Sequence, residues 1–299
     1  MRIAKLFVIP VFIGIIFLYA CNRQAVALNY TNAKDEVPQL GNLIFRFNQP
    51  LVKDSLLNQW DSTEYVSFEP KIPGRFRWEH GDELVFSPAR PLAAATTYKA
   101  KLGSELLRYS KFSSVEKADN ISFSTPDLKL ENTNTTWVMQ DENNKIAVPE
   151  VDLYFNYPVN PTVLKDKLIV MVDGKTANYS MQSVSNDNKI SLRIAGLATE
   201  DRDYDIKISL DKGLVPEGGT NATKEKTEIK ALIPSPFTLT INDINSEHDG
   251  TTGTITVRTS QQVATESLAS FIKFDPAVKF TAEATDDGFI ITSEHFDAS

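Results

Sequence analysis

Leu43-Ile44-Phe45-Arg46-Phe47-Asn48-Gln49-Pro50-Leu51 decides the fold, because apolar and polar residues alternate along it as on a strand with one buried face. Residues 151–159 repeat it as V-D-L-Y-F-N-Y-P-V, and residues 255–263 as I-T-V-R-T-S-Q-Q-V. A leucine follows each copy at the same offset, at Leu56, Leu164 and Leu268. A period of about one hundred residues indicates repeats of one supersecondary unit.

The repeat continues beyond this opening strand. Residues 66–70 (V-S-F-E-P) match residues 272–276 (I-K-F-D-P), and two of the copies close with a strand led by a tyrosine, Tyr98 and Tyr204. Short strands in units of this size are typical of immunoglobulin-like antiparallel β-sandwiches. We therefore expect an all-β chain of tandem sandwiches. The third is expected to be incomplete, because the sequence stops at Ser299 before such a tyrosine.

Two tyrosines and two asparagines have architectural interpretations. Tyr98 and Tyr204 fit either a tyrosine corner, in which the hydroxyl bonds a nearby main-chain group, or a half-buried aromatic on an alternating strand. Asn48 and Asn156 precede the prolines that end the first strand, where a turn or bulge needs a tolerant backbone.

The amino terminus resembles a bacterial lipoprotein signal. Arg2 and Lys5 precede an apolar run, and Leu18-Tyr19-Ala20-Cys21 places the only cysteine of the chain where lipid would be attached. The alternative is an ordinary signal peptide with an incidental cysteine. Lipidation of Cys21 predicts an anchor in the bacterial cell envelope, and Asn22 favours the outer membrane, on its periplasmic or its outer face.

These features divide the chain into five expected regions. They are a lipoprotein signal peptide (1–20), a tether (21–38), two immunoglobulin-like β-sandwich domains (39–127 and 128–234) and a third, truncated one (235–299).

Composition argues against several function classes. The net charge of −8 without a basic stripe opposes nucleic-acid binding. His80, His248 and His295 have no metal-ligand spacing, and no catalytic motif is present, so we expect no enzyme, cofactor or metal. The alternating carboxylates of residues 200–205 leave calcium as an alternative, although no EF-hand loop is complete.

One segment combines basic and aromatic residues, Lys71-Ile72-Pro73-Gly74-Arg75-Phe76-Arg77-Trp78. Arg75 and Trp78 are candidates for a binding surface, because Trp and Arg are favoured at interface hot spots. The alternative is a turn at Pro73-Gly74 followed by a strand whose Phe76 and Trp78 point into the core.

Residues 43–102 contain F-x-F-x-x-P-L, the F-E-P step, P-G-x-F-x-W, L-x-F-x-P and the Thr97-Tyr98 strand. In these motifs the segment resembles the first macroglobulin-type domain of bacterial alpha-2-macroglobulins. The resemblance implies a large envelope protein that traps and inhibits proteases, of which these residues form the anchor and first structural domains. The C-x-E-Q motif of the family thioester is absent here, and no residue is assigned as bait.

Other classes of function stay open. The chain fits a cell-surface lipoprotein whose immunoglobulin-like modules act as an adhesin, a glycan-binding module or a passive stalk. Exposure of Trp60, Trp78 or Trp137 on one face would favour such a binding surface.

Overall fold

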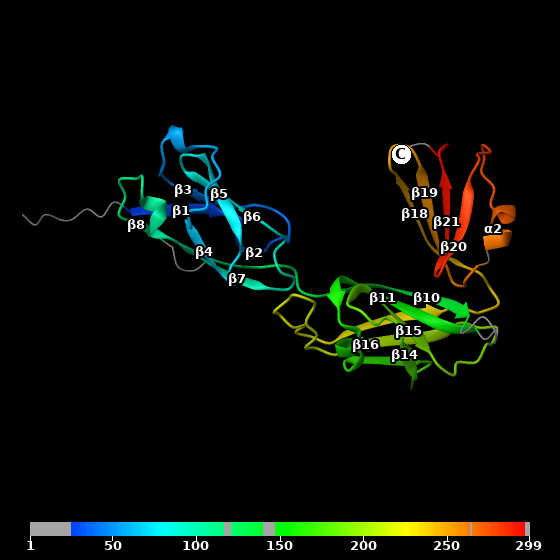
Figure 1. The fold of residues 1–299 in the computed structure, drawn as a ribbon. Coiled ribbons are helices and arrows are strands. Elements are labelled where there is room, and N and C mark those ends of the chain that lie inside the picture. The colour runs from blue at the N-terminus through cyan, green and yellow to red at the C-terminus, as the bar shows by residue number, and fades with distance from the viewer. Residues whose placement is uncertain (1–24, 117–120, 140–146, 264, 297–299) are drawn as a thin grey trace, which may run out of the picture. The chain divides into compact units, whose positions relative to one another are not determined.

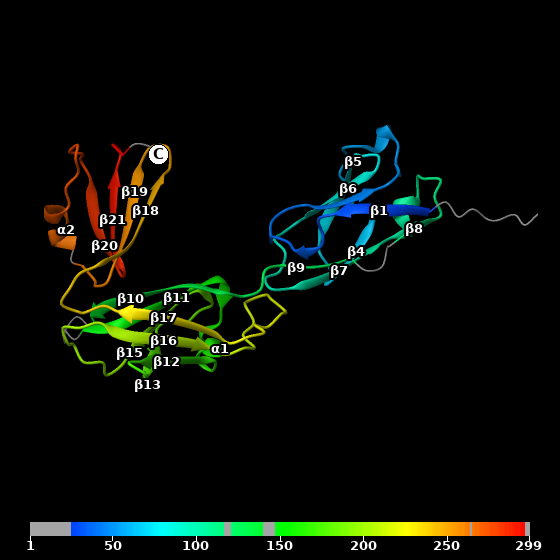
Figure 2. The same cartoon turned by 180° about the vertical axis from the view of Figure 1, so that it is seen from behind.

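The computed structural model describes residues 25–116, 121–139, 147–263 and 265–296. Its strands form five sheets in this described part of the chain (Figures 1 and 2). The described residues form two compact units, one within Met1–Ala33, Asn42–Ser87 and Ala100–Ile121, the other within Lys34–Gly41, Pro88–Lys99 and Ser122–Ser299. Within the described ranges, no helix is long and apolar enough to cross a bilayer.

The first unit contains a five-stranded sheet of order β5-β6-β3-β1-β8. Its inner face is aromatic, because alternate residues of the 43–51 motif and of the P-G-x-F-x-W segment point inward. Phe47 and Trp78 lie with ring centroids 6.2 Å apart, and Phe76 and Phe86 4.7 Å apart. The elements are β1 (Ala25–Thr31), β3 (Leu43–Phe47), β5 (Gly74–His80), β6 (Glu83–Pro88) and β8 (Ser114–Glu116), with the short helices η1 (Asp54–Leu56) and η2 (Ser104–Leu107).

A second sheet has the order β2-β9-β7-β4. Its strands are β2 (Asp35–Glu36), β4 (Val66–Glu69), β7 (Thr97–Leu102) and β9 (Ile121–Ser124). Tyr98 and Phe123 stack at 5.3 Å between ring centroids, and both are buried. The matched steps Glu69-Pro70 and Asp275-Pro276 both have cis peptide bonds.

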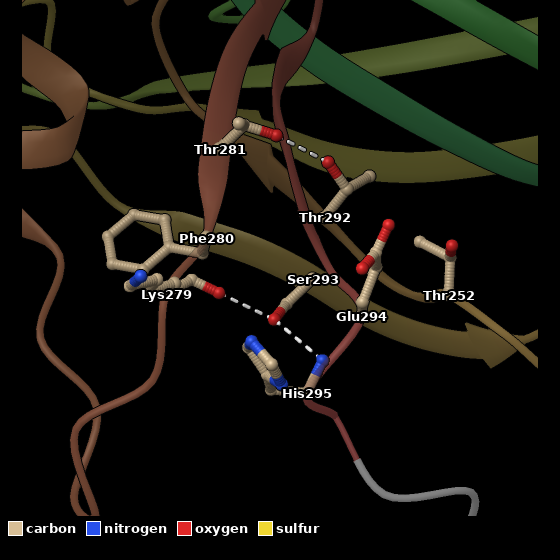
Figure 3. Close-up of a pocket in the computed structure, with 8 residues that line it drawn as sticks. All are labelled: Thr252, Lys279, Phe280, Thr281, Thr292, Ser293, Glu294 and His295. Atoms are coloured by element: carbon tan, nitrogen blue, oxygen red, sulfur yellow. Dashed lines mark hydrogen bonds between the residues drawn. The ribbon is translucent and has the colours of Figure 1, made fainter.

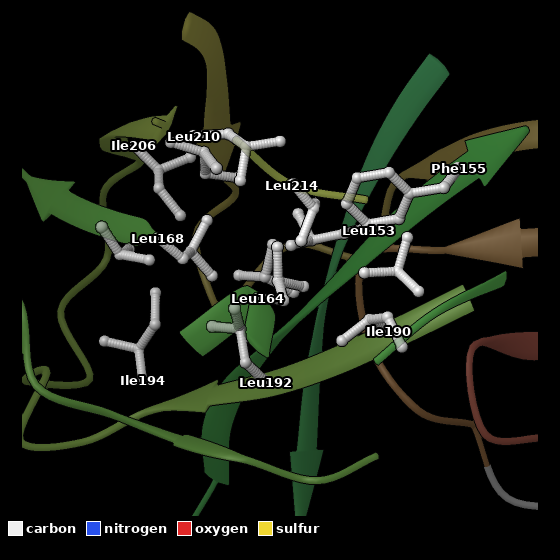
Figure 4. Close-up of a cluster of buried hydrophobic side chains, with 14 of the residues drawn as sticks. Leu153, Phe155, Leu164, Leu168, Ile190, Leu192, Ile194, Ile206, Leu210 and Leu214 are labelled. Atoms are coloured by element: carbon white, nitrogen blue, oxygen red, sulfur yellow. The ribbon is translucent and has the colours of Figure 1, made fainter. Parts of the chain in front are cut away.

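Two further sheets enclose a hydrophobic core, which Figure 4 shows. Their orders are β10-β11-β15-β14 and β13-β12-β16-β17. Leu153, Ile190 and Leu192 are fully buried there, because strand alternation places them on the inner faces, and Leu164 of α1 is fully buried against them. The elements are β10 (Leu130–Met139), β11 (Ala147–Val159), α1 (Pro161–Lys165), β12 (Leu168–Val172), β13 (Lys175–Thr176), β14 (Tyr179–Met181), β15 (Asp187–Ile194), β16 (Tyr204–Leu210) and β17 (Thr227–Ile233).

The fifth sheet, β18-β19-β21-β20, has a much smaller core. Among the described apolar residues of 241–293, only Val257, Ile291 and Leu268 of α2 are buried, whereas Ile241 and Ile244 on β18 are 60% and 58% exposed. The elements are β18 (Ile241–His248), β19 (Gly253–Thr259), α2 (Thr265–Phe271), β20 (Thr281–Thr285) and β21 (Gly288–Ser293).

The three copies of the motif share their local geometry. The strand that precedes each copy has a bulge at the same register, between Leu28 and Tyr30, between Leu130 and Asn132, and between Ile241 and Asp243. Because the bulge recurs at the same register in all three copies, it is a structural feature of the repeated unit. Bulges set where a strand bends and twists.

The sixth residue of each motif copy ties this bulged strand to the next. Its side-chain oxygen accepts a main-chain N–H at 2.8–2.9 Å, and its own N–H donates back to the carbonyl of that same partner. The pairs are Asn48 with Ala27, Asn156 with Lys129 and Ser260 with Thr240. The asparagines were expected to supply backbone tolerance; instead their side chains close a reciprocal hydrogen-bond pair, which serine also makes in the third copy.

The tyrosine corners are confirmed. The hydroxyl of Tyr98 accepts the N–H of Ala93 at 2.9 Å, and the hydroxyl of Tyr204 donates to the carbonyl of Ala198 at 2.6 Å. The prediction of an all-β fold of tandem immunoglobulin-like sandwiches is also confirmed. Most strand pairs are antiparallel as expected, but β1 with β8 and β2 with β9 are parallel.

Candidate functional site

Strand β5 presents two arginines on the outer face of the five-stranded sheet. Side chains alternate along a strand, so Phe76 and Trp78 face the core, where they are 4% and 3% exposed. Arg75 and Arg77 therefore point to the opposite side, and Arg75 is exposed. β5 is the terminal strand of its sheet, which leaves its outer edge to be covered by other backbone.

Trp60 lies against these two arginines because of a local backbone pairing. Asp61 and Phe76 exchange two main-chain hydrogen bonds of 2.8 Å, which fix the segment around Trp60 beside β5. The guanidinium carbons of Arg75 and Arg77 lie 5.6 Å and 4.6 Å from the centroid of the Trp60 ring, within the range of cation–π contacts. The Trp60 side chain is 40% exposed. We name Trp60, Arg75 and Arg77 the Trp–Arg patch.

Asp61 stabilises the turn that carries Trp60. One carboxylate oxygen accepts the N–H and the hydroxyl of Thr63 at 2.7 and 2.8 Å, and the other accepts the hydroxyl of Tyr65 at 2.8 Å. Burial alone would raise the pKa of Asp61, but these hydrogen bonds outweigh it and hold the pKa below its ordinary value. Burial, and then the hydrogen bond to the Asp61 carboxylate, raise the pKa of Tyr65 to about 12.

Because of Tyr65, the free energy of unfolding is expected to fall at alkaline pH. Its folded pKa lies above the unfolded value near 10, so its contribution is complete below about pH 10 and is lost as pH rises toward 12. Two pKa units correspond to about 2–3 kcal/mol. In urea unfolding at a series of pH values, Tyr65→Phe should remove this part of the decline. An identical decline in wild type and variant would contradict the prediction.

Two other arginines on this outer face are paired. Arg77 binds Glu79 in an ion pair, and Arg46 Nε donates to Glu83 at 2.7 Å while lying over the ring of Tyr30. In the described part of the chain, Arg75 has no carboxylate partner. The Trp–Arg patch therefore combines a supported aromatic ring with one uncompensated, exposed cation.

A separate hollow of about 410 Å³ lies beside β20 and β21, and Figure 3 shows the residues that line it. Three of its four hydroxyl groups are engaged within the protein. Ser293 Oγ donates to the carbonyl of Lys279 at 2.6 Å and accepts the N–H of His295 at 3.0 Å, and the hydroxyls of Thr281 and Thr292 share a hydrogen bond of 2.6 Å. No group of His, Cys, Asp and Glu that could hold a metal occurs among the described residues.

The candidate residues indicated by the sequence do not lie together in the structure. Arg75 is at the surface, but Trp78 belongs to the core, so these two side chains do not form one binding surface. Trp137 is also buried. Cys21 and the signal peptide lie outside the described residues.

Three of the four carboxylates considered for calcium have partners from the protein. Glu200 pairs with Arg202, and Asp201 and Asp203 accept hydrogen bonds from Ser235.

The sequence pattern does not predict that Trp60 lies beside β5. It stands alone among polar residues, and only the pairing of Asp61 with Phe76, which is distant in sequence, brings it to Arg75. A lone tryptophan in a polar segment was the one available signal.

The fold defines a class of protein, a chain of tandem immunoglobulin-like β-sandwiches. No family model matches the chain. It is 20% identical over 225 residues to the alpha-2-macroglobulin of Pasteurella multocida (strain Pm70), a match that covers 71% of this chain and 12% of that protein. The chain thus has a distant macroglobulin-like relationship, and it spans about an eighth of the length of this relative.

Two solved structures show weaker likeness. An L,D-transpeptidase from Mycobacterium tuberculosis H37Rv has a TM-score of 0.24 at 12% identity, over 69% of this chain and 76% of that one. The S-layer protein rSbsC(31-844) has a TM-score of 0.22 at 8% identity, over 90% of this chain and 50% of that one. TM-scores of this size carry no inference about fold or chemistry.

Proposed function

We propose that this chain forms the anchor and first structural modules of an alpha-2-macroglobulin-like protein that traps and inhibits proteases in the bacterial cell envelope. The observation that carries the proposal is the similarity to the Pasteurella alpha-2-macroglobulin over 71% of the chain. The tandem sandwiches with a shared bulge and shared hydrogen-bond pair support it, because they are scaffold features. In this proposal the segment is non-catalytic, and proteases meet it through other parts of a longer protein.

The proposed anchor is a lipid on Cys21, in the outer membrane. Several acyl chains, at about 0.8 kcal/mol per buried methylene, hold a protein on a bilayer where one chain gives only marginal binding. The first sandwich begins with β1 at Ala25, so in this proposal residues 22–24 connect Cys21 to that sandwich.

A second candidate is a surface lipoprotein whose immunoglobulin-like modules bind a ligand as an adhesin or glycan-binding module. The exposed Trp60 of the Trp–Arg patch favours it. The two candidates differ in the size of the gene product and in its response to proteases, so one experiment separates them.

That experiment is mass spectrometry of the gene product purified from its own membranes, before and after trypsin treatment. We expect a lipidated product far larger than these residues, cut at one central segment and retaining the protease. A lipidated product of about the size of this chain, without retained protease, would contradict the proposal that the protein traps proteases.

The same preparation tests the anchor. Cys21→Ser should move the protein from the membrane pellet to the soluble envelope fraction, and continued sedimentation with membranes would refute lipidation at this residue.

A further inference from the structure

We propose that the Trp–Arg patch is a docking site for an acidic polypeptide segment, whose carboxylate binds Arg75. The inference concerns the first unit alone and stands whether or not the protein traps proteases. It begins from the uncompensated charge: on the outer face of the five-stranded sheet, Arg46 and Arg77 have glutamate partners, whereas Arg75 has none in the described residues.

The side chain of Arg75 is pre-organised for binding. Its guanidinium lies over the Trp60 ring, so it loses less side-chain freedom on binding than an isolated surface arginine would. A planar guanidinium presents paired N–H donors that match the two oxygens of a carboxylate. Trp60 is fixed in turn by the backbone pairing of Asp61 with Phe76.

The neighbouring aromatic surface fits a polypeptide better than a sugar. Arg75 and Arg77 both lie over the ring of Trp60, so a sugar that stacks on that side of the ring would compete with the two guanidinium groups. The exposed remainder of Trp60 and the partly exposed Tyr30, beside Arg46, are typical of protein interface hot spots, in which Trp, Tyr and Arg are enriched. Charge complementarity selects the partner, because the only unpaired charge of the site is positive.

The fluorescence of Trp60 also provides a way to measure binding at the Trp–Arg patch. Trp78 and Trp137 are each 3% exposed, so acrylamide quenching of tryptophan fluorescence reports mainly on Trp60. The probe is capped hexaglutamate, and hexagalacturonate is a glycan of matched charge. In the full chain, hexaglutamate should protect Trp60 from acrylamide with a saturable dissociation constant that rises with salt.

The variants assign the binding to Arg75. We expect Arg75→Ala to weaken hexaglutamate binding about fivefold and Arg75→Glu about tenfold or more, while circular dichroism stays unchanged because the side chain is exposed. The matched control is Arg90→Ala, which removes another exposed arginine without an ion pair among the described residues and should leave the dissociation constant unchanged.

Three results would overturn the proposal. They are no saturable binding of hexaglutamate at low salt, equal weakening by Arg75→Ala and Arg90→Ala, and tighter binding of hexagalacturonate than of hexaglutamate. The last would assign the patch to acidic glycans.

Discussion

Replacing Gly74 with alanine should destabilise the five-stranded sheet by about 3 kcal/mol, the upper part of the range for overpacking a core. A methyl group on Gly74 would lie 2.5 Å from the main-chain oxygen of Ser87 and closer still to the ring of Phe86. The main-chain oxygen belongs to β6 and the ring belongs to the aromatic core, so neither can move without disturbing the sheet. Hydrogen exchange of the full chain, measured by mass spectrometry, should show faster exchange in peptides from β3 and β6.

The control separates steric contact from the general loss of a glycine. Gly196→Ala meets open space, so it should cost only the backbone strain of an alanine at a φ of 72°, about 1–2 kcal/mol. Combining Gly74→Ala with Phe86→Leu should recover part of the loss, since the ring end that clashes is removed. Equal exchange in Gly74→Ala and wild type would contradict the proposed contact.

Much of the fold could be predicted because its signals are local. Alternation along residues 43–51 and 151–159 reports which side of a strand is buried, and both segments contain strands with Phe45 and Leu153 in the core. The sequence left two alternatives for the tyrosine-led strands, a tyrosine corner or a half-buried aromatic residue. The hydrogen bonds of the Tyr98 and Tyr204 hydroxyl groups show that both are tyrosine corners. Phe76 and Trp78 face the core for the same reason of period two.

What the sequence did not indicate depends on contacts between distant residues. The role of Asn48 is defined by Ala27, and that of Gly74 by Phe86 and Ser87, none of which a local pattern brings together. The same holds for the candidate site. Alternation placed Arg75 on the outer face of β5, but Trp60 reaches it only through a bridge between segments with unrelated patterns. An apolar pattern specifies burial, whereas a polar site requires the register of the sheet.

Replacing Trp137 with alanine should lower the free energy of unfolding of the second sandwich by about 3–5 kcal/mol, as for other buried tryptophans. Trp137 on β10 is 3% exposed, and its indole N–H donates to the carbonyl of Pro234 at 2.6 Å, just after β17. These are terminal strands of the two facing sheets, so the side chain joins the sheets at one side of the core. Alanine removes the ring from this core and leaves the Pro234 carbonyl without its donor. Trp137→Phe keeps most of the packing and should cost about 1–2 kcal/mol.

Urea unfolding followed by circular dichroism measures these losses without relying on the substituted fluorophore, and hydrogen exchange in β11 and β15 assigns them to the second sandwich. Trp60→Ala is the matched control, because it removes the same side chain from a 40% exposed position and should change stability by less than about 1 kcal/mol. Main-chain bonds of Trp137 to Ser260 and Gln262 remain possible in every variant, since no backbone group is removed. Equal losses for Trp137→Ala and Trp60→Ala would mean that Trp137 does not join the two sheets, and a loss in Trp137→Phe as large as in Trp137→Ala would place the whole effect in the hydrogen bond to Pro234.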